Sequence, residues 1–398
     1  MASLLTLEEA QELVLARTRP LKAEPVPIAE AAGRVAAEDV RAAVDLPPFA
    51  SSAMDGFAVR AADLPATLPI VGESAAGRPY DARLEPGGAV AISTGAVVPD
   101  GADAVIPVEV VVQNDNAVEI SRAAEAGAHV RPRGGDVATG DVVVPTGARI
   151  TPARLAAAAA AGIAAIPCAL RPRVAVLATG SELVAPGEPL RPGQIYEANG
   201  LMLASALSAA GAEVVPEPAA ADEAAVLRAA LERGLAADVL VTSGGVSVGE
   251  HDLVRAVERD LGVEEIFWRV AIKPGKPVSF GVRGDTLVFG LPGNPVSALV
   301  GCELFVKPAL RALQGLTEPL PRFEAGRLTA ALRRNEERDE FVRARSRMEG
   351  DIPGLEPIAG QESHMIVRSG AADALVHVPR GNGELPAGAT VRWLPLGA

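Results

Sequence analysis

The stretch VLVTSGGVSVGEHDLVRAV, Val239–Val257, decides the fold of this chain. It opens with three apolar residues after Asp238, a pattern typical of a strand buried on both faces of a parallel sheet. A turn rich in glycine and hydroxyl groups follows, and LVRAV then begins a helical pattern. Glycines let backbone N–H groups approach an anion closely, and a helix N-terminus adds favourable partial charge. The stretch therefore predicts a strand, an anion-binding turn and a helix.

Two carboxylates, Glu250 and Asp252, end this turn. The glycines alone fit an ordinary strand–helix connection equally well. The carboxylates favour an anion site that also contains a metal, because charge repulsion should exclude them from bound phosphate unless a divalent cation bridges the two.

Alternating strand and helix patterns surround this stretch, from Arg171 to Leu313. The alternation predicts a doubly wound α/β domain, in which ligands bind at the carboxyl ends of the strands. Strands are expected over Arg173–Thr179, Asp238–Thr242, Val278–Gly281 and Thr286–Phe289, and helices over Asn199–Ala210, Glu223–Arg233, Asp252–Asp260 and Val296–Leu313.

Three loops follow the predicted strands, and each combines glycine with hydroxyl, amide or carboxylate groups. Their convergence at one sheet edge is a stronger indication of a binding site than any one loop. The turn AIKPGKP adds two lysines on a stiff, proline-rich turn, for which a solvated basic turn is the alternative. The candidate binding residues are Thr179, Gly180, Ser181, Ser243, Gly244, Gly245, Ser247, Gly249, Pro292, Gly293, Asn294, Pro295, Lys273 and Lys276.

The chain before residue 171 begins with a helix. Thr6 and Glu9 form a capping box, which predicts a helix over Leu7–Thr18, and a second small helix is expected over Ile28–Val35. An alanine-rich helix begins after Thr151, and its composition matches the N-terminal helix. We therefore expect the two segments to form one discontinuous domain.

A β-rich domain is predicted between these segments, because short strands alternate with glycine and proline from about residue 70 to 120. Asp55 lies in the loop DLPPFASSAMDGFAV, whose apolar residues should hold it rigidly, as a metal or catalytic site requires; a surface turn is the alternative. Thr94 is a further polar candidate. Asp136, in HVRPRGGDVATGDVVV, fits a functional loop and a hairpin with charged turns equally well.

Short strands return after about Pro321 and indicate a small OB- or barrel-like domain that carries Arg343 and Ser363. The whole chain is thus predicted to be α/β plus β. The expected domain boundaries are residues 1–44 with 143–170, 45–142, 171–316 and 317–398.

The composition excludes several classes of function. The formal net charge of the 398 residues is −13 and no basic face is evident, which argues against nucleic acid as a partner. No signal-peptide pattern is visible, and the longest apolar run, Leu155–Ile166, is too short for membrane insertion. Cys168 and Cys302 are isolated, which favours a reducing, cytoplasmic setting.

Eight motifs in this order resemble the MoeA family of molybdopterin molybdenumtransferases and the related E domain of gephyrin. The resemblance covers essentially the whole chain. It implies a MogA-like α/β domain and a homodimer of four-domain subunits. It also implies insertion of molybdate into adenylyl-molybdopterin with release of AMP, in a step that depends on a divalent metal, expected to be Mg²⁺. The motifs are SSAMDGFAV, ISTGAVVPDGADAVIPVEV, VRPRGGDVATGDVVVPTG, LATGSEL, GQIYEANG, TSGGVSVGEHD, IKPGKPVSFG and GLPGNPVSAL.

The resemblance also assigns roles to individual residues. Asp222 and Asp252 are the implied metal ligands, although Asp222 is matched only by its place in ADEAAVLRAAL. The sequence departs from the family pattern at two places. FASSAMDG lacks the Asn that often precedes SAMDG, and QESHM lacks the glycine before the Ser. These departures leave open that the chain is a specialised paralogue. The implied functional acids are Asp55, Asp136, Glu182, Asp222 and Asp252, and the residues implied to surround molybdate are Lys273, Lys276, Arg343 and Ser363.

Two other functions remain open at this point. A gephyrin-like scaffold would bind a partner peptide and could lose the acids, which are present here. A generic nucleotide-binding protein would explain the α/β domain but not the loops of Asp55 and Asp136. No Ser–His nucleophile pair is visible, so we expect metal-assisted displacement on small-molecule substrates. A molybdopterin adenylyltransferase is expected as a further partner.

Overall fold

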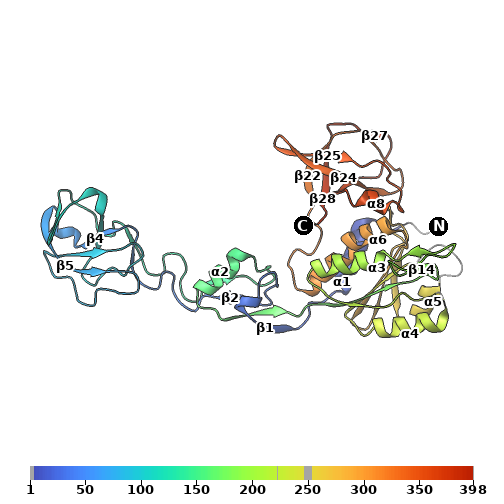
Figure 1. The fold of residues 1–398 in the computed structure, drawn as a ribbon, viewed down its shortest axis with the longest axis horizontal. Coiled ribbons are helices and arrows are strands. Elements are labelled where there is room, and N and C mark those ends of the chain that lie inside the picture. The colour runs from blue at the N-terminus through green and yellow to red at the C-terminus, as the bar shows by residue number, and fades with distance from the viewer. Residues whose placement is uncertain (1–3, 222, 246–252, 398) are drawn as a thin grey trace. The chain divides into compact units, whose positions relative to one another are not determined.

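The computed structural model describes residues 4–221, 223–245 and 253–397. The chain forms two compact units (Figure 1). Unit 1 consists of Met1–Glu24 and Ala169–Ala398, and unit 2 of Pro25–Cys168. No helix of the described residues is long and apolar enough to cross a membrane.

A six-stranded sheet organises the α/β part of unit 1, in the order β16-β13-β17-β21-β20-β18. The first four strands are parallel, and the last two are antiparallel to their neighbours. The strands are β13 (Arg173–Ala178), β16 (Glu213–Pro216), β17 (Val239–Ser243), β18 (Glu264–Trp268), β20 (Ser279–Arg283) and β21 (Thr286–Leu291). Shorter strands are β14 (Leu183–Val184), β15 (Ile195–Tyr196) and β19 (Ile272–Lys273).

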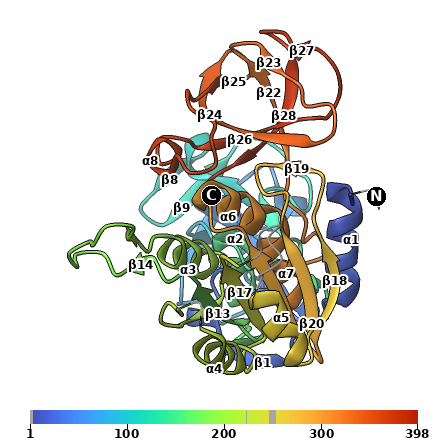
Figure 2. The same ribbon diagram turned by 90° about the vertical axis from the view of Figure 1, so that its right-hand side faces the viewer.

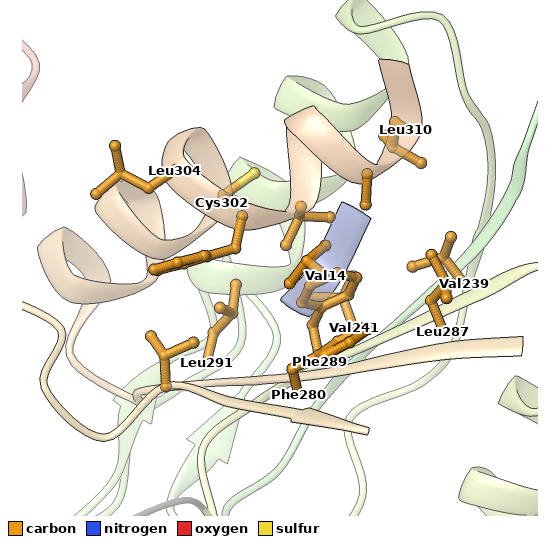
Figure 3. Packing of buried hydrophobic residues seen from close by; sticks show 14 of the residues in the cluster. Val14, Val239, Val241, Phe280, Leu287, Phe289, Leu291, Cys302, Leu304 and Leu310 are labelled. Carbon is orange, nitrogen blue, oxygen red and sulfur yellow. The ribbon is translucent and has the colours of Figure 1, made fainter. Parts of the chain in front are cut away.

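Helices cover both faces of this sheet. Successive side chains of each strand point to opposite faces, so each strand contributes to two cores. Val174 and Val176 pack into one core with α1, α3, α6 and α7, part of which Figure 3 shows. Ala175 and Leu177 pack into a second core with α4 and α5, which lie side by side (Figure 2). The helices are α1 (Leu7–Arg17), α3 (Asn199–Ala209), α4 (Ala224–Gly234), α5 (Leu253–Asp260), α6 (Pro295–Gly301) and α7 (Lys307–Leu313). The predicted doubly wound α/β domain is confirmed.

Two helix predictions need correction. The helix expected over Val296–Leu313 is interrupted by a π-helical turn over Cys302–Val306. Pro308 has no N–H to donate to the Leu304 carbonyl, which instead accepts a bond of 2.9 Å from the Gln11 side chain. The small helix expected over Ile28–Val35 is only a 3₁₀ turn, Ile28–Glu30, because the chain turns at Gly33 with φ 77°.

The C-terminal part of unit 1 is a closed five-stranded barrel, since β24-β25-β22-β28-β26 is closed by a further β24–β26 pairing. This confirms the predicted barrel-like domain. The strand β19 of the α/β part pairs in parallel with the start of β24. The elements are β22 (Glu324–Leu328), β23 (Leu332–Arg333), β24 (Asp339–Glu349), β25 (Ile352–Pro357), α8 (Ile366–Ser369), β26 (Ala374–Val378), β27 (Glu384–Leu385) and β28 (Thr390–Pro395).

Unit 2 contains a six-stranded β sheet in the order β7-β4-β6-β5-β9-β8. A separate core joins residues between Val26 and Val40 to residues between Val144 and Cys168. The elements are β1 (Ala23–Pro27), β2 (Val40–Arg41), β3 (Ser51–Ser52), β4 (Gly56–Val59), β5 (Ala66–Ser74), β6 (Ala89–Ile92), β7 (Ala104–Pro107), β8 (Val112–Asn114), β9 (Ala117–Ile120), β10 (Val130–Arg131), β11 (Val142–Val144), α2 (Pro152–Ala160) and β12 (Ala165–Ala169), with 3₁₀ turns at Ala61–Asp63 and Val108–Val110.

Helix α1 differs from the domain prediction, which grouped residues 1–44 with 143–170. It has the predicted capping box of Thr6 and Glu9. Its apolar residues Leu7, Ala10 and Val14 are buried in the core of the α/β part. Helix α1 therefore belongs to unit 1.

Candidate substrate-binding site

Three loops of unit 1 meet at the carboxyl ends of neighbouring parallel strands β13, β17 and β21. Ser243 lies opposite Ala178 on one side and opposite Leu291 on the other. The ladders continue beyond the strands, because Thr179 N donates to Ser243 O at 2.9 Å and Gly244 N donates to Leu291 O at 3.0 Å. The structure thus brings the predicted binding loops of unit 1 together at this edge.

Close backbone packing explains the glycines at this edge. A Cβ atom at Gly244, where φ is 103°, would lie 2.5 Å from the Thr179 carbonyl oxygen. Gly245, at φ 65°, would meet the Val254 side chain at 2.1 Å. A Cβ atom at Gly293 would make only an ordinary van der Waals contact, 3.7 Å from the Gly244 Cα. Gly244 and Gly245 therefore allow close packing that a side chain at either position would prevent, a use of glycine that also occurs in anion-binding turns.

Asn199, at the start of α3, links two of the loops. Its Nδ2 donates to Ser243 Oγ at 2.9 Å and to Gly293 O at 2.8 Å. The sequence analysis placed Asn199 only as the first residue of a helix. Its partners lie 44 and 94 residues away along the chain. The one sequence signal for Asn199 is therefore its position after the motif GQIYEA and ahead of the predicted helix.

The first loop carries one buried polar residue, Thr179, and two exposed ones, Ser181 and Glu182. Thr179 is 6% exposed, and its hydroxyl has no hydrogen-bond partner among the residues that the structure describes. Such a hydroxyl can bond to a ligand oxygen. The exposed Glu182 folds over Gly180, so that a Cβ atom there would lie 2.6 and 2.7 Å from the two carboxylate oxygens.

Several predicted residues lie outside the described residues: Asp222, Ser247, Gly249, Glu250 and Asp252. Within the described ranges, no group of three or more His, Cys, Asp or Glu side chains has an arrangement that could hold a metal ion. The metal hypothesis therefore rests on Asp222 and Asp252 as sequence positions, with Glu182 as a described carboxylate at the same sheet edge.

The remaining two acids lie in unit 2 on exposed loops. The Asp55 carboxylate accepts the Thr94 N–H at 2.7 Å, so these two predicted residues lie together. Gly56 must lack a side chain, because a Cβ atom would lie 2.0 Å from the Ile106 carbonyl oxygen. The loop of Asp136 is held beside the start of the Asp55 loop, since Asp136 N donates to Leu46 O at 2.9 Å.

Asp45 fixes the Asp136 loop, a role that the sequence analysis missed. Its carboxylate accepts bonds from Thr139 N at 2.8 Å, from Thr139 Oγ1 at 2.7 Å and from Arg133 Nε at 2.6 Å. The Thr139 bonds, together with Arg133, lower the pKa of Asp45 to about 2. An aspartate before a proline-rich loop is typical of a turn, so its residue type and position do not indicate these contacts.

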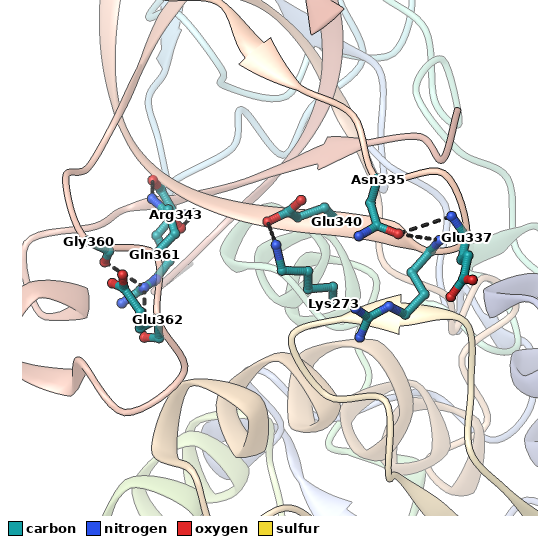
Figure 4. Close-up of polar contacts among 9 residues, drawn as sticks. Lys273, Asn335, Glu337, Glu340, Arg343, Gly360, Gln361 and Glu362 are labelled. Carbon is teal, nitrogen blue, oxygen red and sulfur yellow. Dashed lines mark hydrogen bonds and ion pairs between the residues drawn. The ribbon is translucent and has the colours of Figure 1, made fainter. Parts of the chain in front are cut away.

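Two of the cations predicted to surround molybdate, Lys273 and Arg343, lie on different sides of β24 (Figure 4). Lys273 forms an ion pair with Glu340, with 2.9 Å between Nζ and Oε1. Arg343 is 1% exposed, and its guanidinium donates to the carbonyls of Gly360, Glu362 and Met365. Burial lowers the pKa of this guanidinium from its usual range.

Arg343 therefore fixes the loop that carries Ser363. The Ser363 carbonyl accepts the N–H of Val296 at 3.0 Å, directly after the loop of Asn294 and Pro295. Ser363 thus lies beside a predicted binding loop, while Arg343 holds the loop from behind. Lys276 is partly buried in the turn that also carries Lys273.

Glycine loops at the carboxyl ends of parallel strands, with helices on both faces of the sheet, place this part of the chain in the doubly wound α/β class. Comparison with known proteins then gives the family. Three family models match in chain order: the MoeA N-terminal region (domain I and II) over residues 5–162, a probable molybdopterin binding domain over 175–312, and the MoeA C-terminal region (domain IV) over 325–396.

Relatives match over nearly the full length. The chain is 41% identical over 399 residues to molybdopterin molybdenumtransferase 2 of Mycobacterium tuberculosis, with 96% of this chain and 97% of that protein covered. It is 38% identical over 402 residues to the molybdopterin molybdenumtransferase of Haemophilus influenzae, with 99% of each covered. A crystal structure of a molybdopterin biosynthesis MoeA protein from Pyrococcus horikoshii aligns with a TM-score of 0.86 at 28% identity, over 99% of this chain and 100% of that chain. The chain belongs to the MoeA family of molybdopterin molybdenumtransferases, a family of transferases.

Proposed function

We propose that this chain is a molybdopterin molybdenumtransferase that inserts molybdate into adenylyl-molybdopterin and releases AMP. The observation that carries the proposal is the meeting of three loops at the ends of β13, β17 and β21, held by Asn199 and by backbone contacts at Gly244. Full-length relatives with this name support the same activity.

The residues of this edge suit the two anionic substrates. Backbone N–H groups and the Thr179 hydroxyl would bind the phosphates of the adenylylated substrate. Lys273 and Lys276 would attract molybdate, with Ser363 nearby on the loop that Arg343 fixes. Donors that are fixed before the reaction would stabilise the charge that develops on a leaving phosphate.

A divalent cation, Mg²⁺ in our proposal, would be held by Asp222 and Asp252. When bound, it would offset negative charge on the phosphates. Glu182, exposed at the same edge, is the described carboxylate that could orient water or the cation.

We further propose that the chain acts as a homodimer. Asp55, Thr94 and Asp136 belong to unit 2, whereas the three loops belong to unit 1. The acids of one subunit would complete the loops of the other, as the family resemblance implies. Light scattering at micromolar concentration should give twice the chain mass, and a fully active monomer would contradict the proposal.

We further propose a cytoplasmic location. A molybdopterin adenylyltransferase would be the source of the adenylylated substrate. The two cysteines, Cys168 and Cys302, are buried free thiols, which suits a reducing compartment.

The deciding experiment is release of AMP from adenylyl-molybdopterin, measured by chromatography with and without molybdate. We expect AMP to appear only when molybdate is present. A chelator should suppress release about tenfold or more, and added Mg²⁺ should restore it. A folded protein that releases no AMP but binds a peptide would support the scaffold alternative instead.

A further inference from the structure

The ion pair of Lys273 lies where the α/β part of unit 1 meets the C-terminal barrel. Strand β19 runs parallel to the start of β24, with Ile272 opposite Asp339 and Lys273 opposite Glu340. This register places the two side chains next to each other, and Nζ lies 2.9 Å from Oε1 (Figure 4).

Glu340 points toward the mouth of the barrel. Val342, two residues further along β24, is buried in the barrel core, so Glu340 shares its face. Phe341 and Arg343 point to the opposite side. A polar cavity of about 540 Å³ opens at this mouth, lined by Lys273, Glu340, Arg333, Arg334, Asn335 and Glu337 among others.

Two other residues of this lining make contacts that do not involve Lys273. Arg334 donates to the carbonyls of Pro379 and Arg380. The backbone N–H of Glu337 donates to the side-chain oxygen of Asn335, which begins a turn. Lys273 and Glu340 form an ion pair that faces the cavity. The Glu340 side chain is 15% exposed and that of Lys273 is 45% exposed, so the carboxylate is the more firmly held partner.

We propose that Glu340 sets the oxyanion affinity of Lys273. Its carboxylate holds the ammonium in place and competes with a tetrahedral oxyanion for the same N–H donors. An oxyanion bound to Lys273 would also be repelled by the carboxylate, since the two negative charges would share one ammonium. Glu340 thus acts through Lys273 as a positioning residue. This inference rests on the proposed role of Lys273 in binding molybdate.

Glu340→Gln tests the inference, because glutamine keeps an oxygen that can accept from Lys273 but removes the negative charge. The variant should bind sodium molybdate about three- to tenfold more tightly in titration calorimetry. The gain should shrink as salt is raised, because Lys273 is half exposed. In the AMP-release assay, KM for molybdate should fall while kcat changes less than about twofold; a merely structural role would not lower KM.

Two controls isolate the pair. Glu337→Gln removes the same charge from the same cavity without touching Lys273, and should leave molybdate affinity close to that of the parent protein. When Lys273→Ala is present, adding Glu340→Gln should no longer change molybdate affinity, because the ammonium for which the two anions compete is gone. Thermal melting checks that each variant is folded.

Binding of molybdate alone separates this inference from the proposed function. Tighter binding by Glu340→Gln in a protein that releases no AMP would support the inference and count against the proposed activity. Unchanged or weaker binding in a protein that releases AMP would overturn the inference alone. If neither the parent protein nor the variant binds molybdate, the inference is also overturned.

Discussion

The binding loops of unit 1 and the acidic loops of unit 2 are built in different ways. In unit 1, Gly244 packs so closely on Thr179 that a Cβ atom there would clash with the Thr179 carbonyl, and one half-buried amide links the loops of Ser243 and Gly293. In unit 2, exposed carboxylates such as Asp55 accept backbone N–H groups at the protein surface. An added atom at Gly244 should therefore disrupt the first region, whereas the position of Asp55 should tolerate a side chain that keeps the hydrogen bond. Charge should thus be removable at Asp55 without loss of the hydrogen bond that holds its loop.

Gly244→Ala should have the largest effect. The new Cβ atom would lie 2.5 Å from the Thr179 carbonyl in a backbone with φ 103°, so the loops must separate. We expect AMP release to fall about 100-fold or more, because small displacements of binding groups are costly to catalysis. Melting temperature should fall by several degrees.

Gly262→Ala is the matched control for that substitution. Gly262 has φ 84°, but nothing lies within 4 Å of its Cβ position. The Gly262→Ala variant should be destabilised by the same kind of backbone strain, but its rate of AMP release should match that of the parent protein. Equal loss of activity in both variants would mean that strain, rather than loop contact, governs the site.

Asp55→Asn should have the second largest effect on AMP release. Asparagine can still accept the Thr94 N–H through its side-chain oxygen, so unit 2 should melt as before. If the carboxylate stabilises charge in the reaction, AMP release should fall about 100-fold in a protein of unchanged stability. Asp63→Asn is the control, because Asp63 accepts the Gly87 N–H at 2.8 Å in the same unit and has no proposed role. Activity that survives in Asp55→Asn would remove Asp55 from the mechanism.

Asn199→Ala should have a smaller effect on turnover. It removes two hydrogen bonds between loops whose backbone contacts remain, so we expect kcat/KM to fall about tenfold. Gln314→Ala provides the comparison: Gln314 donates to Ala210 O, just beyond the other end of α3, and to Leu310 O. The Gln314→Ala variant should lose stability but keep its activity. If Asn199→Ala and Gln314→Ala lost activity equally, Asn199 would have a general role in folding rather than a role in the site.

The sequence predicted the loops of this site better than the links between them. Apolar runs that end in glycine and hydroxyl residues reveal buried strands and the turns after them, and Ser243 and Thr179 lie at such ends. Asn199 was missed because its function depends on partners in two other loops. Strand β18 was missed because EEIFW begins with charged residues at the edge of the sheet.

Arg343 shows a second limit of the sequence. A cation near glycine-rich and hydroxyl residues suggests an anion ligand, but the direction of its side chain depends on strand register. The structure buries its guanidinium against the carbonyls of the loop that carries Ser363. A pattern of residue types cannot distinguish a cation that binds a ligand from one that holds the loop beside it.

Asp45→Asn should have the smallest effect, and one confined to stability. The bonds from Thr139 and Arg133 lower the pKa of Asp45 to about 2 in the folded protein, against a usual value near 4. The charged carboxylate therefore stabilises the fold above about pH 4, and this contribution is lost as pH falls through about 2. Melting temperatures of the parent protein and the variant should differ by a constant amount between pH 5 and pH 8, and the difference should narrow steadily below pH 4. Because Asp45 fixes the loop of Asp136 from the surface, a difference that stayed constant down to pH 2 would show that asparagine disturbs the loop through its shape rather than through the lost charge.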